Sequence, residues 1–90
     1  MDHLHYSFEA APGDVIEVVI DRAANVQLLD GSNYEKYLEG RTYHYSGGYA
    51  TTSPVRFRVS QPGARHVVID LGGGAGRVSA SAGLIAGVPR

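Results

Sequence analysis

The sequence contains no cysteine, which excludes disulfide bridges, thiolate metal sites and a cysteine nucleophile and fits a reducing compartment. No apolar run approaches the ~18 residues that a membrane helix needs. Met1–Ala10 lacks the basic start and apolar stretch of a signal peptide, so we expect a cytoplasmic protein with no membrane partner. A single lysine and a net charge of −1 argue against a dedicated nucleic-acid binder.

The sequence is rich in period-two alternation of apolar and polar residues, which is typical of half-buried antiparallel strands. Val55–Val59 is the clearest case, because its three apolar residues are separated by Arg56 and Arg58. Other short segments have the same character or are denser in valine and isoleucine. The expected strands are 4–8, 14–21, 25–29, 41–46, 55–59, 66–71 and 77–84, with 49–52 as a doubtful eighth.

Glycine and proline mark the turns between these strands. Pro12-Gly13 and Pro62-Gly63 each suit the centre of a type II turn, Gly47-Gly48 suits a tight hairpin, and Gly72–Gly76 suits a wider connection. One short helix is expected after Ser32, because Ser32 and Glu35 have the spacing of a capping box. Gly40 would close this helix in the left-handed conformation.

Together these patterns predict one domain over residues 1–90 that is all-β or mostly so. Its expected architecture is an antiparallel β-sandwich or a small barrel of seven to eight short strands with one short helix. The strand list fits both architectures equally well, so strand order is left open.

Charge is divided unevenly along the chain. Residues 1–40 carry a net charge of −6, whereas residues 41–90 carry +5 because six arginines face a single aspartate. A basic face for an anionic ligand is one interpretation. The alternative is that strands from the two halves interleave in space and that their charges cancel locally.

His3, His5 and Glu9 form the group most suggestive of metal chemistry. On one strand their side chains point the same way, and two imidazoles with a carboxylate can hold zinc, iron or manganese. The spacing resembles the first metal motif of the cupins, and His44 or His66 would be a further ligand. The second cupin motif is not matched, because Gly63 stands one position early.

Tyrosines are concentrated in a short stretch that also contains arginine and histidine. Aromatic rings with hydroxyl tips beside arginine suit the recognition of a sugar, a nucleobase or a peptide. Arg41, Tyr43 and Tyr45 would share one face of the expected strand 41–46. The candidate ligand-binding residues are Tyr34, Tyr37, Arg41, Tyr43 and Tyr45, with Arg56 and Arg58 as further anion contacts.

Other catalytic signatures are weak. Gly72–Gly76 lacks the features of a dinucleotide or phosphate loop, and no Gly-x-Ser-x-Gly elbow is present. We therefore predict no catalytic residues and no cofactor.

Several segments, in order, resemble a bacterial domain-of-unknown-function family, the one numbered eighteen eighty-three. They are Leu4–Tyr6, Ala24–Tyr34, Gly40-Arg41, Gly47-Gly48, Ser53–Arg56 and Val68–Gly73. The resemblance implies a small, mostly β domain that sometimes sits beside Toll/interleukin-receptor-type domains. It implies no activity. Family members often carry an aromatic residue where this chain has Arg65-His66. The layout is more loosely similar to prepeptidase C-terminal β-sandwich modules.

We therefore expect a non-enzymatic sensing module that binds a small anionic ligand or a protein partner. Two alternatives are kept, a cupin-like metal-dependent enzyme that uses His3, His5 and Glu9, and a self-assembling structural domain. In the last case the halves of opposite charge would pair head-to-tail into a homo-oligomer.

Overall fold

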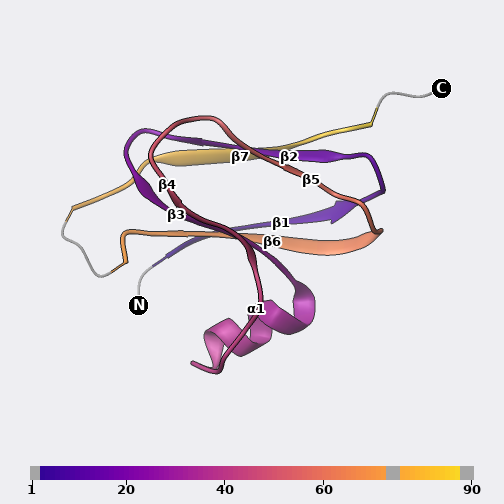
Figure 1. The fold of residues 1–90 in the computed structure, drawn as a ribbon, viewed down its shortest axis with the longest axis horizontal. Coiled ribbons are helices and arrows are strands. Elements are labelled where there is room, and N and C mark those ends of the chain that lie inside the picture. The colour runs from indigo at the N-terminus through magenta and orange to yellow at the C-terminus, as the bar shows by residue number, and fades with distance from the viewer. Residues whose placement is uncertain (1–2, 73–75, 88–90) are drawn as a thin grey trace.

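The structure is a computed structural model that describes residues 3–72 and 76–87. It contains seven strands and one helix (Figure 1). Their bounds are β1 (Leu4–Ala10), β2 (Val15–Ile20), β3 (Ala24–Asp30), α1 (Gly31–Leu38), β4 (Ser46–Ala50), β5 (Val55–Arg58), β6 (Gly63–Asp70) and β7 (Ala80–Ile85).

The strands form two antiparallel sheets. The four-stranded sheet has the order β1-β6-β3-β4, and the three-stranded sheet has the order β5-β2-β7. The described strands thus form a sandwich and not a closed barrel, which confirms the expected fold class and decides between its two architectures. The two sheets lie one above the other, and α1 covers the side of the four-stranded sheet that faces away from β2 and β7 (Figure 1).

The core lies between the sheets, where the alternating apolar residues of both inner faces meet. In β2 the buried residues Ile16, Val18 and Ile20 alternate with more exposed neighbours. In the opposite sheet Val26 and Ile69 are direct partners across β3 and β6, and each is at most 1 % exposed. The predicted alternation therefore fixes which face of each strand is buried.

A second buried layer lies under α1. Leu29 and Val68 point to the outer face of the four-stranded sheet, yet they are only 1 % and 0 % exposed. Their burial under the helix explains why Leu29 and Val68 break the alternation of β3 and β6, whereas β1 and β5 alternate. The helix itself contains no fully buried residue, so its place on the sheet depends on half-buried side chains.

The helix begins differently from the sequence expectation. Its N-cap is Asp30, whose Oδ1 accepts a hydrogen bond from the Asn33 backbone N–H at 2.9 Å. Ser32 donates instead to that same carboxylate, so the capping box of Ser32 and Glu35 is wrong. A carboxylate is the better acceptor at the positive end of a helix, which accounts for the earlier start. Gly40 ends the helical region with φ +72°, as expected.

The expected strand 41–46 is also wrong, as is the hairpin at Gly47-Gly48. Residues 41–45 run irregularly, and both glycines belong to β4, where they pair with β3. Local side-chain bonds replace the ladder, because Tyr43 donates to Gln27 at 2.8 Å and the His44 N–H donates to Asn33 at 2.9 Å. Gly47 has φ +101° and lies so close to the carbonyl of Val26 that a Cβ would not fit. Glycine is needed at this position because β4 approaches the backbone of β3 closely.

The remaining turns and strand ends agree in part with the positions expected from the sequence. Pro12-Gly13 forms the expected turn, with the Asp14 N–H bonded to the Ala11 carbonyl at 3.0 Å and Gly13 at φ +92°. Gly63 instead begins β6, and β7 begins at Ala80 and not at residue 77. The expected connection 72–76 lies partly outside the described residues.

Candidate functional site

Seven aromatic and imidazole rings gather on the outer face of the four-stranded sheet, and we call this group the ring cluster. They come from β1 and the residue before it, from α1, from the segment 41–45 and from β6. The members are His3, His5, Tyr34, Tyr37, Tyr43, Tyr45 and His66. The helix therefore meets the sheet mainly through rings.

His5 and His66 lie side by side beneath Tyr34. The Nε2 atom of His5 is 2.8 Å from the Nδ1 atom of His66. The Tyr34 ring is stacked on His5 at 4.2 Å and 13° and on His66 at 4.5 Å and 7°. One tyrosine from the helix thus stacks on both imidazoles of a pair that joins two neighbouring strands.

The hydrogen bond between the two imidazoles restricts their protonation. Of the two facing nitrogens one must donate and the other must accept, so the bond is lost when both carry a proton. Partial burial lowers the pKa of His5, and the neighbouring His66 and His3 lower it further. The fold therefore favours an imidazole pair that is not doubly charged.

Tyr37 and Tyr43 extend the ring cluster toward the end of the helix. Tyr37 meets His3 edge-to-face at 5.1 Å and Tyr43 edge-to-face at 5.3 Å. The Tyr37 hydroxyl is buried and has no hydrogen-bond partner among the described residues. Burial raises the pKa of Tyr37, with smaller contributions from Asp70 and the neighbouring tyrosines. This hydroxyl stays neutral at physiological pH.

A hollow of about 390 Å³ opens beside these rings. Its lining residues are His3, Tyr37, Leu38, Gly40, Arg41 and Tyr43. The Arg41 side chain is 65 % exposed, and its guanidinium lies 3.2 Å from the Glu39 carboxylate, which is also exposed. Such a surface ion pair is weak, so Arg41 remains available to an anion at the rim. We call this hollow the Arg41 cavity.

Five of the seven predicted binding residues lie in this region. Tyr37, Arg41 and Tyr43 line the Arg41 cavity, and Tyr34 packs beside Tyr37 with ring centroids 6.2 Å apart. Tyr45 contacts the ring of Tyr43 at 5.5 Å and lines a smaller hollow of about 270 Å³. The expected shared strand face does not exist, and the helix and an irregular segment bring these residues together instead.

Arg56 and Arg58 lie elsewhere, on the outer face of the three-stranded sheet. Arg56 is paired with Glu17 on the neighbouring strand at 2.9 Å. More generally, β6 lies between β1 and β3, and β2 lies between β5 and β7. The acidic first half and the basic second half of the chain therefore interleave in both sheets and do not form separate faces.

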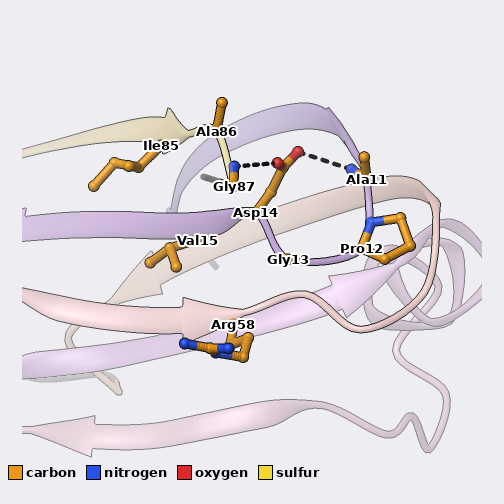
Figure 2. Close-up of a pocket in the computed structure, with 9 residues that line it drawn as sticks. All are labelled: Ala11, Pro12, Gly13, Asp14, Val15, Arg58, Ile85, Ala86 and Gly87. Atoms are coloured by element: carbon orange, nitrogen blue, oxygen red, sulfur yellow. Dashed lines mark hydrogen bonds between the residues drawn. The ribbon is translucent and has the colours of Figure 1, made fainter. Parts of the chain in front are cut away.

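Arg58 borders a hollow of about 650 Å³ at the end of the sandwich where β2 begins (Figure 2). The carboxylate of Asp14 in its wall is occupied, because Oδ2 accepts from the Ala11 N–H at 2.8 Å and Oδ1 from the Gly87 N–H at 3.0 Å. These backbone bonds lower the pKa of Asp14. This carboxylate therefore joins the turn before β2 to the segment that follows β7.

The structure does not assemble the cupin-like ligand set. His3 and His5 join the ring cluster, but Glu9 lies four residues further along β1, about 13 Å from His5 at the usual rise of a strand. Within residues 3–72 and 76–87, no three histidine, aspartate or glutamate side chains are placed to share a metal ion.

Sequence reasoning missed two contributors to this site. Gln27 and Asn33 hold the segment 41–45 in place through their side chains. The pairing of His5 with His66 was also missed, because the two are 61 residues apart and only the strand register brings them together.

The comparisons with known proteins identify the family but no activity. No described helix is long and apolar enough to span a membrane. No curated protein and no solved structure gives a significant match. The family DUF1883, a domain of unknown function, matches residues 1–86. The chain therefore belongs to DUF1883, the family that the resemblance in its sequence indicated.

Proposed function

We propose that this chain is a non-catalytic sensing module that binds a small anionic ligand with a planar ring in the Arg41 cavity. The observation that carries the proposal is the combination of Tyr37, Tyr43 and Arg41 around one hollow. A volume of about 390 Å³ falls within the usual range for small-molecule sites. As part of this proposal, the module acts in the bacterial cytoplasm, since a chain without cysteine suits a reducing compartment.

The chemistry of the lining selects the ligand class. Ring faces and edges favour a planar group, and a guanidinium at the rim favours a carboxylate or phosphate by paired charge-assisted hydrogen bonds. Arg41 gives up only a weak, exposed contact with Glu39 when it binds an anion. The proposal is for binding and not catalysis, because the nearby imidazoles of His5 and His66 already bond to each other and stack on Tyr34.

The test is a titration of the isotope-labelled chain with phenyl phosphate, followed by amide chemical shifts in NMR spectra. Inorganic phosphate and phenol serve as separate arms that offer the anion or the ring alone. We expect saturable shifts around Tyr37, Arg41 and Tyr43, with phenyl phosphate binding more tightly than either fragment. Shifts elsewhere, or no shifts at ~10 mM phenyl phosphate, well above the ~1 mM dissociation constant of a weak ligand, would overturn the proposal.

Two arginine variants locate the anion contact. Arg41→Ala should weaken phenyl phosphate binding about tenfold or more, because it removes charge-assisted hydrogen bonds. Arg58→Ala removes the same charge beside the hollow at the end of the three-stranded sheet and should leave binding unchanged. Equal losses in both variants would mean that the phosphate is attracted by general charge and not by the Arg41 cavity.

A further inference from the structure

The two sheets have four edge strands, and three of them carry features that prevent pairing with another chain. β1 places His5 and Glu9 on its outer face, and β5 has only four residues, of which Arg56 and Arg58 are charged. β4 contains two glycines with positive φ, Gly47 and Gly48, which make its backbone irregular. Charges, shortness and irregular backbone are the usual protections of an exposed edge.

β7 has none of these protections. Its sequence is Ala-Ser-Ala-Gly-Leu-Ile, without charge or proline, and Gly83 does not have a positive φ. Leu84 and Ile85 are 39 % and 48 % exposed. Among the described strands only β2 pairs with β7, so one side of its backbone is open. β7 is therefore a regular and apolar template for another strand.

The contacts at both ends of β7 show which of its backbone groups are open. The Ser79 carbonyl accepts from the Asp21 N–H at 3.1 Å, and the Gly87 N–H donates to Asp14 at 3.0 Å, so residues 79 and 87 point toward β2. Backbone groups alternate in direction along a strand, so residues 81, 83 and 85 also point toward β2. The N–H and C=O groups of Ala82 and Leu84 then point outward.

The beginning of β7 is already covered. The Ala80 carbonyl, which also points away from β2, accepts a hydrogen bond from the Tyr6 hydroxyl at 2.9 Å. Tyr6 belongs to β1 in the opposite sheet, so the sandwich itself occupies this group. Besides the Ala80 N–H, the open groups are the N–H and C=O groups of Ala82 and Leu84.

We propose that two copies of this chain pair through β7, antiparallel about a two-fold axis at Gly83. In this register Ala82 of one copy lies opposite Leu84 of the other, and each such pair exchanges two hydrogen bonds. The two pairs use the N–H and C=O groups of Ala82 and Leu84 in each copy and leave the Ala80 carbonyl with Tyr6. The result is a continuous six-stranded sheet, which would extend the three-stranded sheet of each copy.

The side chains of β7 suit this self-pairing. Opposite residues on one face are Ala82 and Leu84, and on the other they are Ser81 and Ile85, so a small side chain meets a large one in each pair. Gly83 meets its own copy at the axis, where facing residues come closest, and a Cβ there would find no atom within 4 Å in the single chain. No charge lies on β7, so self-pairing causes no repulsion between like charges.

Sedimentation velocity over a series of protein concentrations tests the dimer. The weight-average mass should rise from 9.6 kDa toward about twice that value between ~1 µM and ~500 µM, the range of transient self-association. Hydrogen exchange of the Ala82 and Leu84 amides should slow in parallel. A monomer at every concentration, or a dimer in which these two amides still exchange freely, would overturn the proposal.

Two variants of β7 distinguish edge pairing from other modes of association. Gly83→Lys places two like charges at the axis, and Ala82→Pro removes an outward N–H without breaking a bond to β2. Each should raise the dissociation constant of the dimer at least tenfold. Ser46→Lys adds the same charge to the edge strand β4 and should dimerise like the unaltered chain. Circular dichroism confirms that each variant is folded.

Salt dependence separates this dimer from the head-to-tail assembly through opposite charges. Pairing through uncharged β7 strands should be nearly independent of salt between ionic strengths of ~0.05 M and ~0.5 M. Exposed charges become strongly screened over this range. Loss of the dimer at high salt would overturn the proposal and favour assembly through charge.

Discussion

Replacing Tyr34 with alanine should release α1 from the four-stranded sheet. An isolated helix of eight residues does not persist in water, and α1 has no fully buried residue of its own. It is attached in part by the Tyr34 ring, which is stacked on His5 at 4.2 Å and on His66 at 4.5 Å. Each aromatic contact contributes about 0.5–1.5 kcal/mol beyond the area that it buries.

The two stacks together predict that Tyr34→Ala lowers the free energy of unfolding by about 2 kcal/mol. For a chain of this size that loss corresponds to a decrease of roughly 8–16 °C in melting temperature. Urea denaturation followed by circular dichroism would measure it, with the helical part of the signal already reduced without urea. Tyr34→Phe keeps both stacks and should remain within about 0.5 kcal/mol of the unaltered chain.

The result that would refute this reasoning is a Tyr34→Ala variant as stable as the unaltered chain, with its helix signal intact. It would mean that Leu29 and Val68, which are buried under the helix, hold α1 without the rings. An equal loss in Tyr34→Phe would assign the effect to the hydroxyl and not to stacking.

Three further predictions follow from the described contacts. Gly47→Ala should lower the free energy of unfolding, measured by urea denaturation, by about 2 kcal/mol, because alanine is strained at φ +101° and its Cβ would meet the Val26 carbonyl. Gly31→Ala at the helix start should instead raise the free energy of unfolding by about 0.5 kcal/mol. The folded chain lowers the pKa of His5, so as the pH falls below about 6.5 the unfolded chain is the first to protonate this imidazole. The free energy of unfolding should therefore decrease until the pH has passed the folded pKa. His5→Gln should flatten a plot of melting temperature against pH over that range. Backbone hydrogen bonds lower the pKa of Asp14, so its stabilisation should be complete at neutral pH and should decrease as the pH falls below 3.8 toward the lower folded pKa. Asp14→Asn should therefore be less stable than the unaltered chain at pH 7, and thermal melts should show this difference shrink below pH 3.8.

The sequence predicted what depends on local periodicity. The alternation in β1 and β5, the dense apolar runs of β2 and β6 and the turn at Pro12-Gly13 all hold in the structure, because side-chain direction in a strand has a period of two. In β2 the dense apolar run has only one buried face, because Val19 is exposed, whereas β6 is covered on both faces at Val68 and Ile69. Periodicity did not reveal that a single short helix covers the second face.

The errors occur where contacts between distant residues override local preference. The segment 41–45 alternates like a strand, but the hydrogen bonds of Tyr43 and His44 with Gln27 and Asn33 hold it in an irregular path. Tyr34, Tyr37, Tyr43 and Tyr45 were grouped because they are close in sequence, and ring contacts join them in the structure. His66 could not be placed with them, because only the register of β1 against β6 brings it to His5.

The two proposed surfaces lie on different parts of the molecule and can therefore be tested separately. The Arg41 cavity belongs to the helix-covered side of the four-stranded sheet, and the β7 edge belongs to the three-stranded sheet. A two-fold axis perpendicular to a continuous sheet keeps the same face of both copies on one side. In such a dimer both Arg41 cavities would open on that side, so a ligand displayed on a surface or polymer would meet two sites at once. Gly83→Lys should then leave the binding of free phenyl phosphate unchanged and weaken binding to a phenyl phosphate-coated surface, whereas Arg41→Ala should weaken both.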